Sequence, residues 1–126
     1  MPGAGKHLVV GVDDDFRVRE SIESLVESAG YEALVFSSAE DFLRSGALAS
    51  ATCVVTDVRM PGMDGLELQR HVRRERPELP VIFISAHYET RQRALDEGAV
   101  GFLNKPFDAA DLLGVIQTAV NKSPQV

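Results

Sequence analysis

The fold can be worked out from one segment, Cys53-Val54-Val55-Thr56-Asp57-Val58-Arg59-Met60-Pro61-Gly62-Met63-Asp64-Gly65. It opens with apolar and β-branched residues, which are typical of a strand buried on both faces. An aspartate, Asp57, ends this run, and a loop rich in proline and glycine follows it. Open α/β sheets place their chemistry beyond the carboxyl ends of their strands, so Asp57 is the first candidate functional residue.

Similar apolar runs occur on both sides of this one, and amphipathic stretches separate them. We expect five strands, at residues 8–12, 33–36, 53–56, 81–84 and 100–103. This alternation is typical of parallel strands joined by crossover helices. The runs are almost continuously apolar, which indicates that helices cover both faces of the sheet. The sequence therefore predicts a doubly wound α/β fold with a five-stranded parallel sheet.

Local signals indicate where three of the helices lie. In the first, apolar residues recur at helical spacing, at Val18, Ile22, Leu25, Val26 and Ala29. Ser37, with Glu40 three residues later, has the pattern of a capping box and would begin the second helix. Asp108 would begin the last helix.

Composition limits the class of protein. A length of 126 residues fits one domain, 1–126, with a core of about 7–121 and ends that are frayed or start a linker. The net charge of -6 argues against direct nucleic-acid binding, which needs a basic surface. The apolar runs are too short for a membrane span or a signal peptide, so we expect no membrane association and a cytoplasmic location. The single cysteine, Cys53, is expected to be a buried packing residue.

Polar side chains follow the first, third, fourth and fifth predicted strands directly: Asp13, Asp14, Asp15, Asp57, Ser85 and Lys105. Right-handed crossovers bring the carboxyl ends of parallel strands to one edge, so these residues should lie near one another. Carboxylates ~4 Å apart repel by roughly 4 kcal/mol at an effective dielectric constant of about 20, so the acids need a cation or a proton. An all-oxygen site with few protein ligands suits Mg²⁺.

Four segments, in this order, resemble the receiver domain of two-component response regulators: residues 12–15, residues 54–65, Ile84-Ser85-Ala86-His87 and Lys105-Pro106-Phe107. The resemblance covers roughly residues 7–121. Residues 55–61 and 102–107 are similar to receivers of the nitrogen-fixation regulator type. The resemblance implies a flavodoxin-like fold with strand order 2-1-3-4-5, and a signalling domain rather than an enzyme.

The resemblance also implies a metal site. The acidic pair would be Asp14 and Asp15. Direct Mg²⁺ ligands would be Asp15, Asp57 and the backbone carbonyl of Arg59, whereas Asp14 would act mostly through water.

Phosphorylation is the second implication. Asp57 would be the phosphoacceptor, while Lys105 and Ser85 would bind phosphoryl oxygens. Ser85 and Phe102 would form the switch, which would change the surface of the fourth helix, fifth strand and fifth helix. The Lys105–Pro106 bond would be cis. Because Lys105 lies only 20 positions after Ser85, a shorter spacing than in many relatives, the fourth helix should be short.

The implied partner is a sensor histidine kinase or a phosphotransfer protein. Receivers of this type usually precede a C-terminal DNA-binding domain that regulates transcription, so we expect such an output domain or a partner protein. We expect a monomer that is able to dimerise when phosphorylated.

Other functions fit part of the pattern. An aspartate-nucleophile phosphohydrolase shares the Asp, Ser, Lys and Mg²⁺ chemistry, but needs a second acid where this chain has Arg59. A phosphorylation-independent binding scaffold would not need both Asp57 and Lys105. Taken singly, an acidic triplet most often caps a helix and a lysine is most often solvated. Their grouping at one sheet edge favours a functional site.

Overall fold

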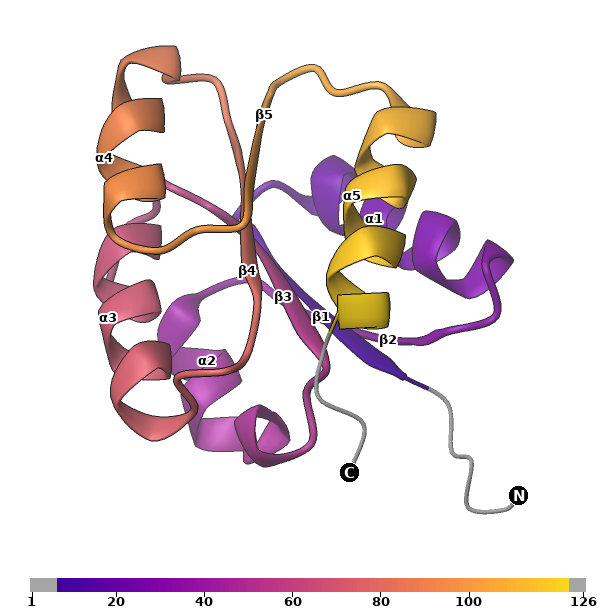
Figure 1. The fold of residues 1–126 in the computed structure, drawn as a ribbon, viewed down its shortest axis with the longest axis horizontal. Helices are drawn as coiled ribbons and strands as arrows, with labels where there is room; N and C mark the ends of the chain where they lie inside the picture. Colours follow the sequence, from indigo (N-terminus) through magenta and orange to yellow (C-terminus); the bar gives the residue numbers. More distant parts are fainter. Residues whose placement is uncertain (1–6, 123–126) are drawn as a thin grey trace.

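The computed structural model describes residues 7–122. Five parallel strands form one sheet in the order β2-β1-β3-β4-β5 (Figure 1). The strands are β1 (Leu8–Val12), β2 (Glu32–Phe36), β3 (Cys53–Asp57), β4 (Val81–Ser85) and β5 (Gly101–Asn104). The predicted fold class and strand order are confirmed, and each predicted strand end lies within one residue of the observed end.

Helices cover both faces of the sheet, as predicted. They are α1 (Phe16–Ser28), α2 (Ala39–Ser45), α3 (Gly65–Glu75), α4 (Arg91–Asp96) and α5 (Ala109–Lys122), with short 3-10 helices η2 (Ala47–Ala49) and η3 (Tyr88–Thr90). Figure 1 shows α2, α3 and α4 on one face of the sheet and α1 and α5 on the other. Of the ends outside the predicted core of 7–121, residue 122 belongs to α5, and the rest lie outside the described residues.

Each face of the sheet has its own hydrophobic core. Successive side chains of a strand point to opposite faces, so Val54 belongs to the core that contains Phe42 and Val72, whereas Val55 belongs to the core that contains Ile22 and Ile116. Every residue of β3 is buried, as its apolar sequence predicts. Cys53 is part of this core, and burial raises the pKa of its thiol to about 12, which fits a packing role.

The start of α2 differs from the prediction. Its N-cap is Ser38, whose hydroxyl accepts a hydrogen bond from the Asp41 backbone N–H (3.0 Å). The predicted capping box of Ser37 and Glu40 is therefore wrong. The Glu40 carboxylate instead accepts a hydrogen bond from the Met63 N–H (2.9 Å) in the loop after β3. A contact across 23 residues has displaced a local one.

The fourth helix is short, as expected. It has six residues and is preceded directly by η3. Among the helices of residues 7–122, none is both long and apolar enough to cross a membrane.

Candidate functional site

Asp57 is the last residue of β3, and only 7% of its surface is exposed. Its Oδ1 atom accepts a hydrogen bond from the Val58 N–H (2.8 Å), and its Oδ2 atom accepts one from Lys105 Nζ (3.1 Å). The same Nζ lies 2.8 Å from Oδ2 of Asp13. One lysine therefore bridges two carboxylates that follow different strands.

Three acids gather at this edge of the sheet. Asp13, Asp14 and Asp57 each offer a carboxylate oxygen within 4.8 Å of the others. Asp13 is fully buried, whereas Asp14 is exposed. This all-oxygen donor set fits a hard cation such as Mg²⁺.

Burial controls the charges of the bridging lysine and its acid partner. Desolvation raises the pKa of Asp13 above its ordinary value, although the hydrogen bond from Lys105 opposes the change. Desolvation alone would lower the pKa of Lys105, but its hydrogen bonds to Asp13 and Asp57 outweigh this, and the pKa is raised. Lys105 is therefore a firmly charged ammonium beside the acidic cluster.

Asp15 was predicted as a direct metal ligand, but it lies at the N-cap of α1, where its Oδ1 accepts the Arg17 N–H (2.8 Å). Asp13, not Asp15, joins the cluster. The reason is pairing between strands: the Asp13 N–H continues the hydrogen bonds of the sheet by donating to the Phe36 carbonyl (3.1 Å). The candidate acidic pair is corrected to Asp13 and Asp14.

Ser85 ends β4 and is fully buried. Its Oγ atom accepts a hydrogen bond from the His87 N–H (2.8 Å), and its carbonyl accepts one from the Lys105 N–H (2.9 Å). Phe102 pairs with Phe83 in the sheet and is half-buried, with its ring at right angles to Tyr88 (centroids 6.4 Å apart). The Lys105–Pro106 bond is cis, as expected.

Arg59 points its side chain toward the loop after β4. Its Nη2 atom lies 3.3 Å from Glu89 Oε2, and His87 Nδ1 lies 3.6 Å from the same oxygen. All three side chains are exposed, so screening by solvent keeps these pairs weak. The predicted role of the Arg59 carbonyl stays a prediction.

Gly65 is a supporting residue to which sequence reasoning assigned no role. Its N–H donates to the Val58 carbonyl (2.7 Å), and a Cβ atom there would lie 2.0 Å from the Asp57 carbonyl oxygen. Only glycine permits this approach between the start of α3 and the end of β3. The sequence signal that could have identified this role is the position of the glycine directly after Asp64, whose side chain caps α3.

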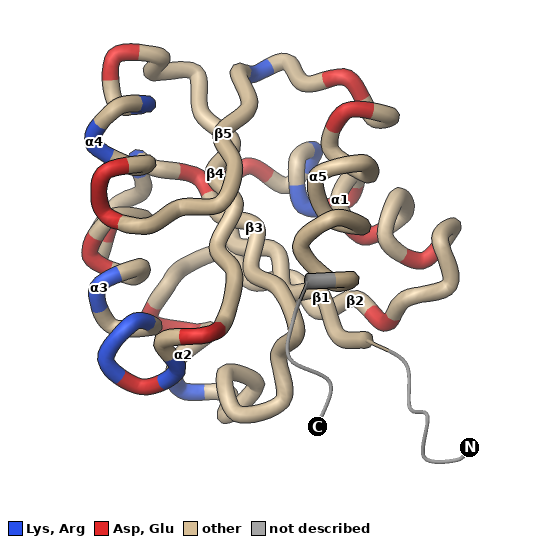
Figure 2. Tube along the Cα trace, in the orientation of Figure 1, with Lys and Arg blue, Asp and Glu red and all other residues tan. Residues whose placement is uncertain are grey.

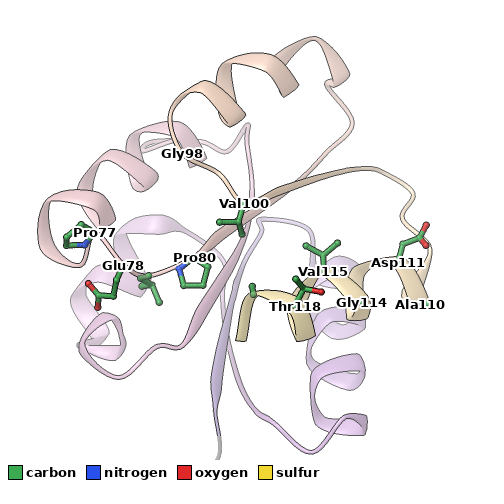
Figure 3. A pocket seen from close by; sticks show the side chains of 12 residues that line it. Pro77, Glu78, Pro80, Gly98, Val100, Ala110, Asp111, Gly114, Val115 and Thr118 are labelled. Atoms are coloured by element: carbon green, nitrogen blue, oxygen red, sulfur yellow. The ribbon is translucent and has the colours of Figure 1, made fainter. Parts of the chain in front are cut away.

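A groove of about 710 Å³ lies away from this site, along α5 and beside the chain entering β4 and β5 (Figure 3). Val100 lies at its centre, and Glu78 and Asp111 lie toward opposite ends. Asp57, Ser85 and Lys105 do not line it. The groove is therefore separate from the acidic cluster.

Known proteins share both the sequence pattern and the fold. The response regulator receiver domain family matches residues 9–117. Response regulator protein TmoT of Ectopseudomonas mendocina is 43% identical over 116 residues, which are 90% of this chain and 53% of TmoT. Transcriptional regulatory protein FixJ of Bradyrhizobium diazoefficiens is 36% identical over 119 residues, which are 93% of this chain and 58% of FixJ. A crystal structure of a response regulator receiver domain protein from Clostridium thermocellum matches with a TM-score of 0.85 at 30% identity, over 92% of this chain and 95% of that one.

The chain spans about half the length of the first curated relatives it matches. The family match covers most of its residues and includes Asp57, Ser85 and Lys105. The resemblance inferred from the sequence, including the likeness to nitrogen-fixation regulators, is confirmed. The chain thus belongs to the response regulator receiver domain family, whose members are signalling modules of two-component systems.

Proposed function

We propose that Asp57 accepts a phosphoryl group from a phosphohistidine of a sensor histidine kinase or a phosphotransfer protein. The observation that carries this proposal is the Lys105 ammonium, held between Asp57 (3.1 Å) and Asp13 (2.8 Å) at the edge where three strands end. A nucleophilic carboxylate, a fixed cation and a cluster of oxygen donors are the parts that phosphoryl transfer needs.

The transfer is a displacement at phosphorus. A carboxylate oxygen of Asp57 forms the new P–O bond as the P–N bond breaks, and the imidazole nitrogen keeps the electron pair. The Lys105 ammonium stabilises charge on the phosphoryl oxygens, and the Ser85 hydroxyl donates a hydrogen bond to one of them. The step needs no general base, because the attacking carboxylate oxygen has no proton to lose.

Asp13, Asp14 and Asp57 are the residues that would hold Mg²⁺, with the Arg59 backbone carbonyl as a further ligand. Support comes from their carboxylate oxygens, which lie within 4.8 Å of one another. When bound, the ion neutralises the charge that otherwise repels an anionic phosphoryl group from three carboxylates. Asp15 is not included, because its carboxylate caps α1.

Asp13→Asn is expected to weaken Mg²⁺ binding by about tenfold or more, because it removes a charged ligand. Without metal, it should raise the free energy of unfolding by roughly 1 kcal/mol at neutral pH. The sign follows from the raised pKa of Asp13, caused chiefly by burial. Because the pKa of Asp13 is higher in the folded protein than in the unfolded chain, Asp13 stabilises the fold at pH values below its ordinary pKa. That stability is lost as the pH rises through the pKa of the folded state, so asparagine is the less costly residue at neutral pH.

Asp14→Asn is the matched control, because Asp14 is exposed and Asp13 is buried. It should weaken Mg²⁺ binding with little gain in stability. Titration with Mg²⁺ and urea unfolding at several pH values measure both effects. Equal stability changes in the two variants would contradict the role given to burial.

Phosphorylation is proposed to act on the α4–β5–α5 surface through Ser85. The Ser85 hydroxyl now accepts the His87 N–H, so a hydrogen bond to the phosphoryl group would pull the chain before η3 inward. Phe102, which packs against Tyr88 of η3, would follow. A charge-assisted hydrogen bond of about 1.5–3 kcal/mol shifts a two-state population about tenfold to a hundredfold.

The setting of this domain is also proposed. We propose one receiver domain over residues 1–126, with a core of about 7–121, in a cytoplasmic protein. Its output would be a C-terminal DNA-binding domain or a partner protein; the related FixJ is a transcriptional regulatory protein. The unphosphorylated domain would be a monomer that is able to dimerise after phosphorylation.

Incubation with acetyl phosphate and Mg²⁺ tests the proposal. Intact mass should increase by one phosphoryl group, and peptide mapping should locate it at Asp57. Chelation of the metal should prevent the increase, because the acidic cluster then repels the donor. An unchanged mass with Mg²⁺ present, or a phosphoryl group at another residue, would sink the proposal.

A further inference from the structure

Glu97, the residue directly after α4, joins α4 to α3. Its Oε1 atom accepts a hydrogen bond from Arg70 Nε (3.0 Å), and its Oε2 atom accepts one from Arg70 Nη2 (3.1 Å). The pair is bidentate, a geometry that restricts both distance and orientation. The Glu97 side chain is 24% exposed, against 66% for Glu89 in the pair with Arg59. The Arg70–Glu97 contact is therefore better shielded from solvent.

Arg73, one turn further along α3, strengthens this contact. Its Nη1 atom donates to the Glu97 carbonyl, and a Cβ atom at Gly98 would lie only 3.0 Å from that nitrogen. Gly98 has φ +104°, a conformation that favours glycine. The Arg73 guanidinium thus lies against the backbone of Gly98, which has no side chain, directly after the end of α4. Figure 2 shows basic positions on α3 and acidic positions at the end of α4.

The beginning of α4 is connected differently. Its N-cap residue, Thr90, makes no capping hydrogen bond through its side chain to the described residues, and its hydroxyl instead donates to the His87 carbonyl (2.6 Å). The His87 N–H in turn donates to Ser85 Oγ. The N-terminus of α4 is therefore linked to the proposed phosphorylation site, and its C-terminus is linked to α3.

We propose that Glu97 is a fixed pivot: within the segment that joins β4 to β5, rearrangement on phosphorylation is confined to residues 85–94, and the turn at 97–100 keeps its place on α3. The inference rests on the proposed function of Asp57, and it adds that the rearrangement caused by phosphorylation stops at Glu97. Gly98 and Val100 line the groove beside α5 (Figure 3), so that wall of the groove stays in place in both states.

Two arginine variants separate the pivot from ordinary helix stability. Arg70 and Arg93 both bind the Glu97 carboxylate, but Arg93 belongs to α4 itself (3.3 Å, four residues away). Arg70→Ala removes the side-chain link between the helices and leaves only the Arg73 contact to the Glu97 carbonyl, whereas Arg93→Ala removes a local contact at the end of α4. In the unphosphorylated protein, Arg70→Ala should speed amide hydrogen exchange at residues 97–99 by about fivefold, and Arg93→Ala by less than about twofold. Equal effects of the two variants would overturn the pivot.

Beryllofluoride with Mg²⁺, as a phosphoryl mimic, tests where movement stops. In the wild type, exchange should change at residues 86–92 and stay the same at 97–99. In Arg70→Ala the change should extend to 97–99. A wild-type change that already includes 97–99 overturns the inference. If the wild type takes no phosphoryl group from acetyl phosphate, the proposed function fails instead, and exchange in the unphosphorylated variants still decides whether Glu97 anchors α4.

Discussion

Asp57→Asn is expected to abolish phosphoryl uptake from acetyl phosphate while the protein stays folded. An amide is not a nucleophile toward phosphorus, and the other acids of the cluster follow a different strand and cannot take its place. The carbonyl oxygen of the substituted side chain keeps the acceptor position now used by the Val58 N–H (2.8 Å). Removing one charge from three crowded carboxylates should raise the free energy of unfolding without metal by about 1 kcal/mol. Intact mass and urea unfolding measure the two effects.

Asp96→Asn is the matched control for this variant. Asp96 is the last residue of α4, and its carboxylate accepts a hydrogen bond from Gln92 Nε2 (2.8 Å), which asparagine is also able to accept. It should take up phosphoryl groups at the wild-type rate. Normal uptake by Asp57→Asn, or loss of uptake by Asp96→Asn, would show that the acceptor lies elsewhere.

Gly65→Ala is expected to lower the free energy of unfolding by about 3 kcal/mol or more and to slow phosphoryl uptake severely. The new Cβ atom would lie 2.0 Å from the Asp57 carbonyl oxygen and 3.0 Å from Phe83 Cε1. Neither neighbour is free to withdraw, because Phe83 is fully buried and Asp57 belongs to the central part of the sheet. Relief requires movement of the Asp57 backbone, which displaces the nucleophile from Lys105. Urea unfolding and the rate of mass increase measure both effects.

Gly114→Ala is the matched control: it is the same substitution, but it is expected to raise the free energy of unfolding rather than lower it. Gly114 lies within α5, and a Cβ atom built there would meet no atom of residues 7–122 within 4 Å other than those of its chain neighbours and the nearby backbone of its own helix. Alanine has the higher helix propensity, so the variant should be more stable by about 0.5–1 kcal/mol and take up phosphoryl groups normally. Similar stability in the two variants would contradict the close approach at Gly65.

Local patterns in the chain were enough to predict the fold class and to place three candidate site residues at one edge of the sheet. Each apolar run predicts one strand, and each amphipathic stretch predicts one helix. Asp57, Ser85 and Lys105 each lie at or directly after the carboxyl end of a strand, and parallel strands place those ends at one edge. Their meeting was therefore predictable from order alone, and the order of the motifs also identified the family.

Contacts between distant segments were needed to show which acid of the triplet joins Asp57 and which caps a helix. Asp13, Asp14 and Asp15 are chemically alike, so their separate roles depend on where the sheet ends. That point is set by the hydrogen bond from Asp13 to Phe36, a residue of another strand. The role of Gly65 and the proposed pivot at Glu97 likewise depend on contacts with residues far away in the sequence, which the residues next to them in the chain do not reveal. Local sequence specifies periodicity, whereas long-range pairing fixes the position and direction of each side chain.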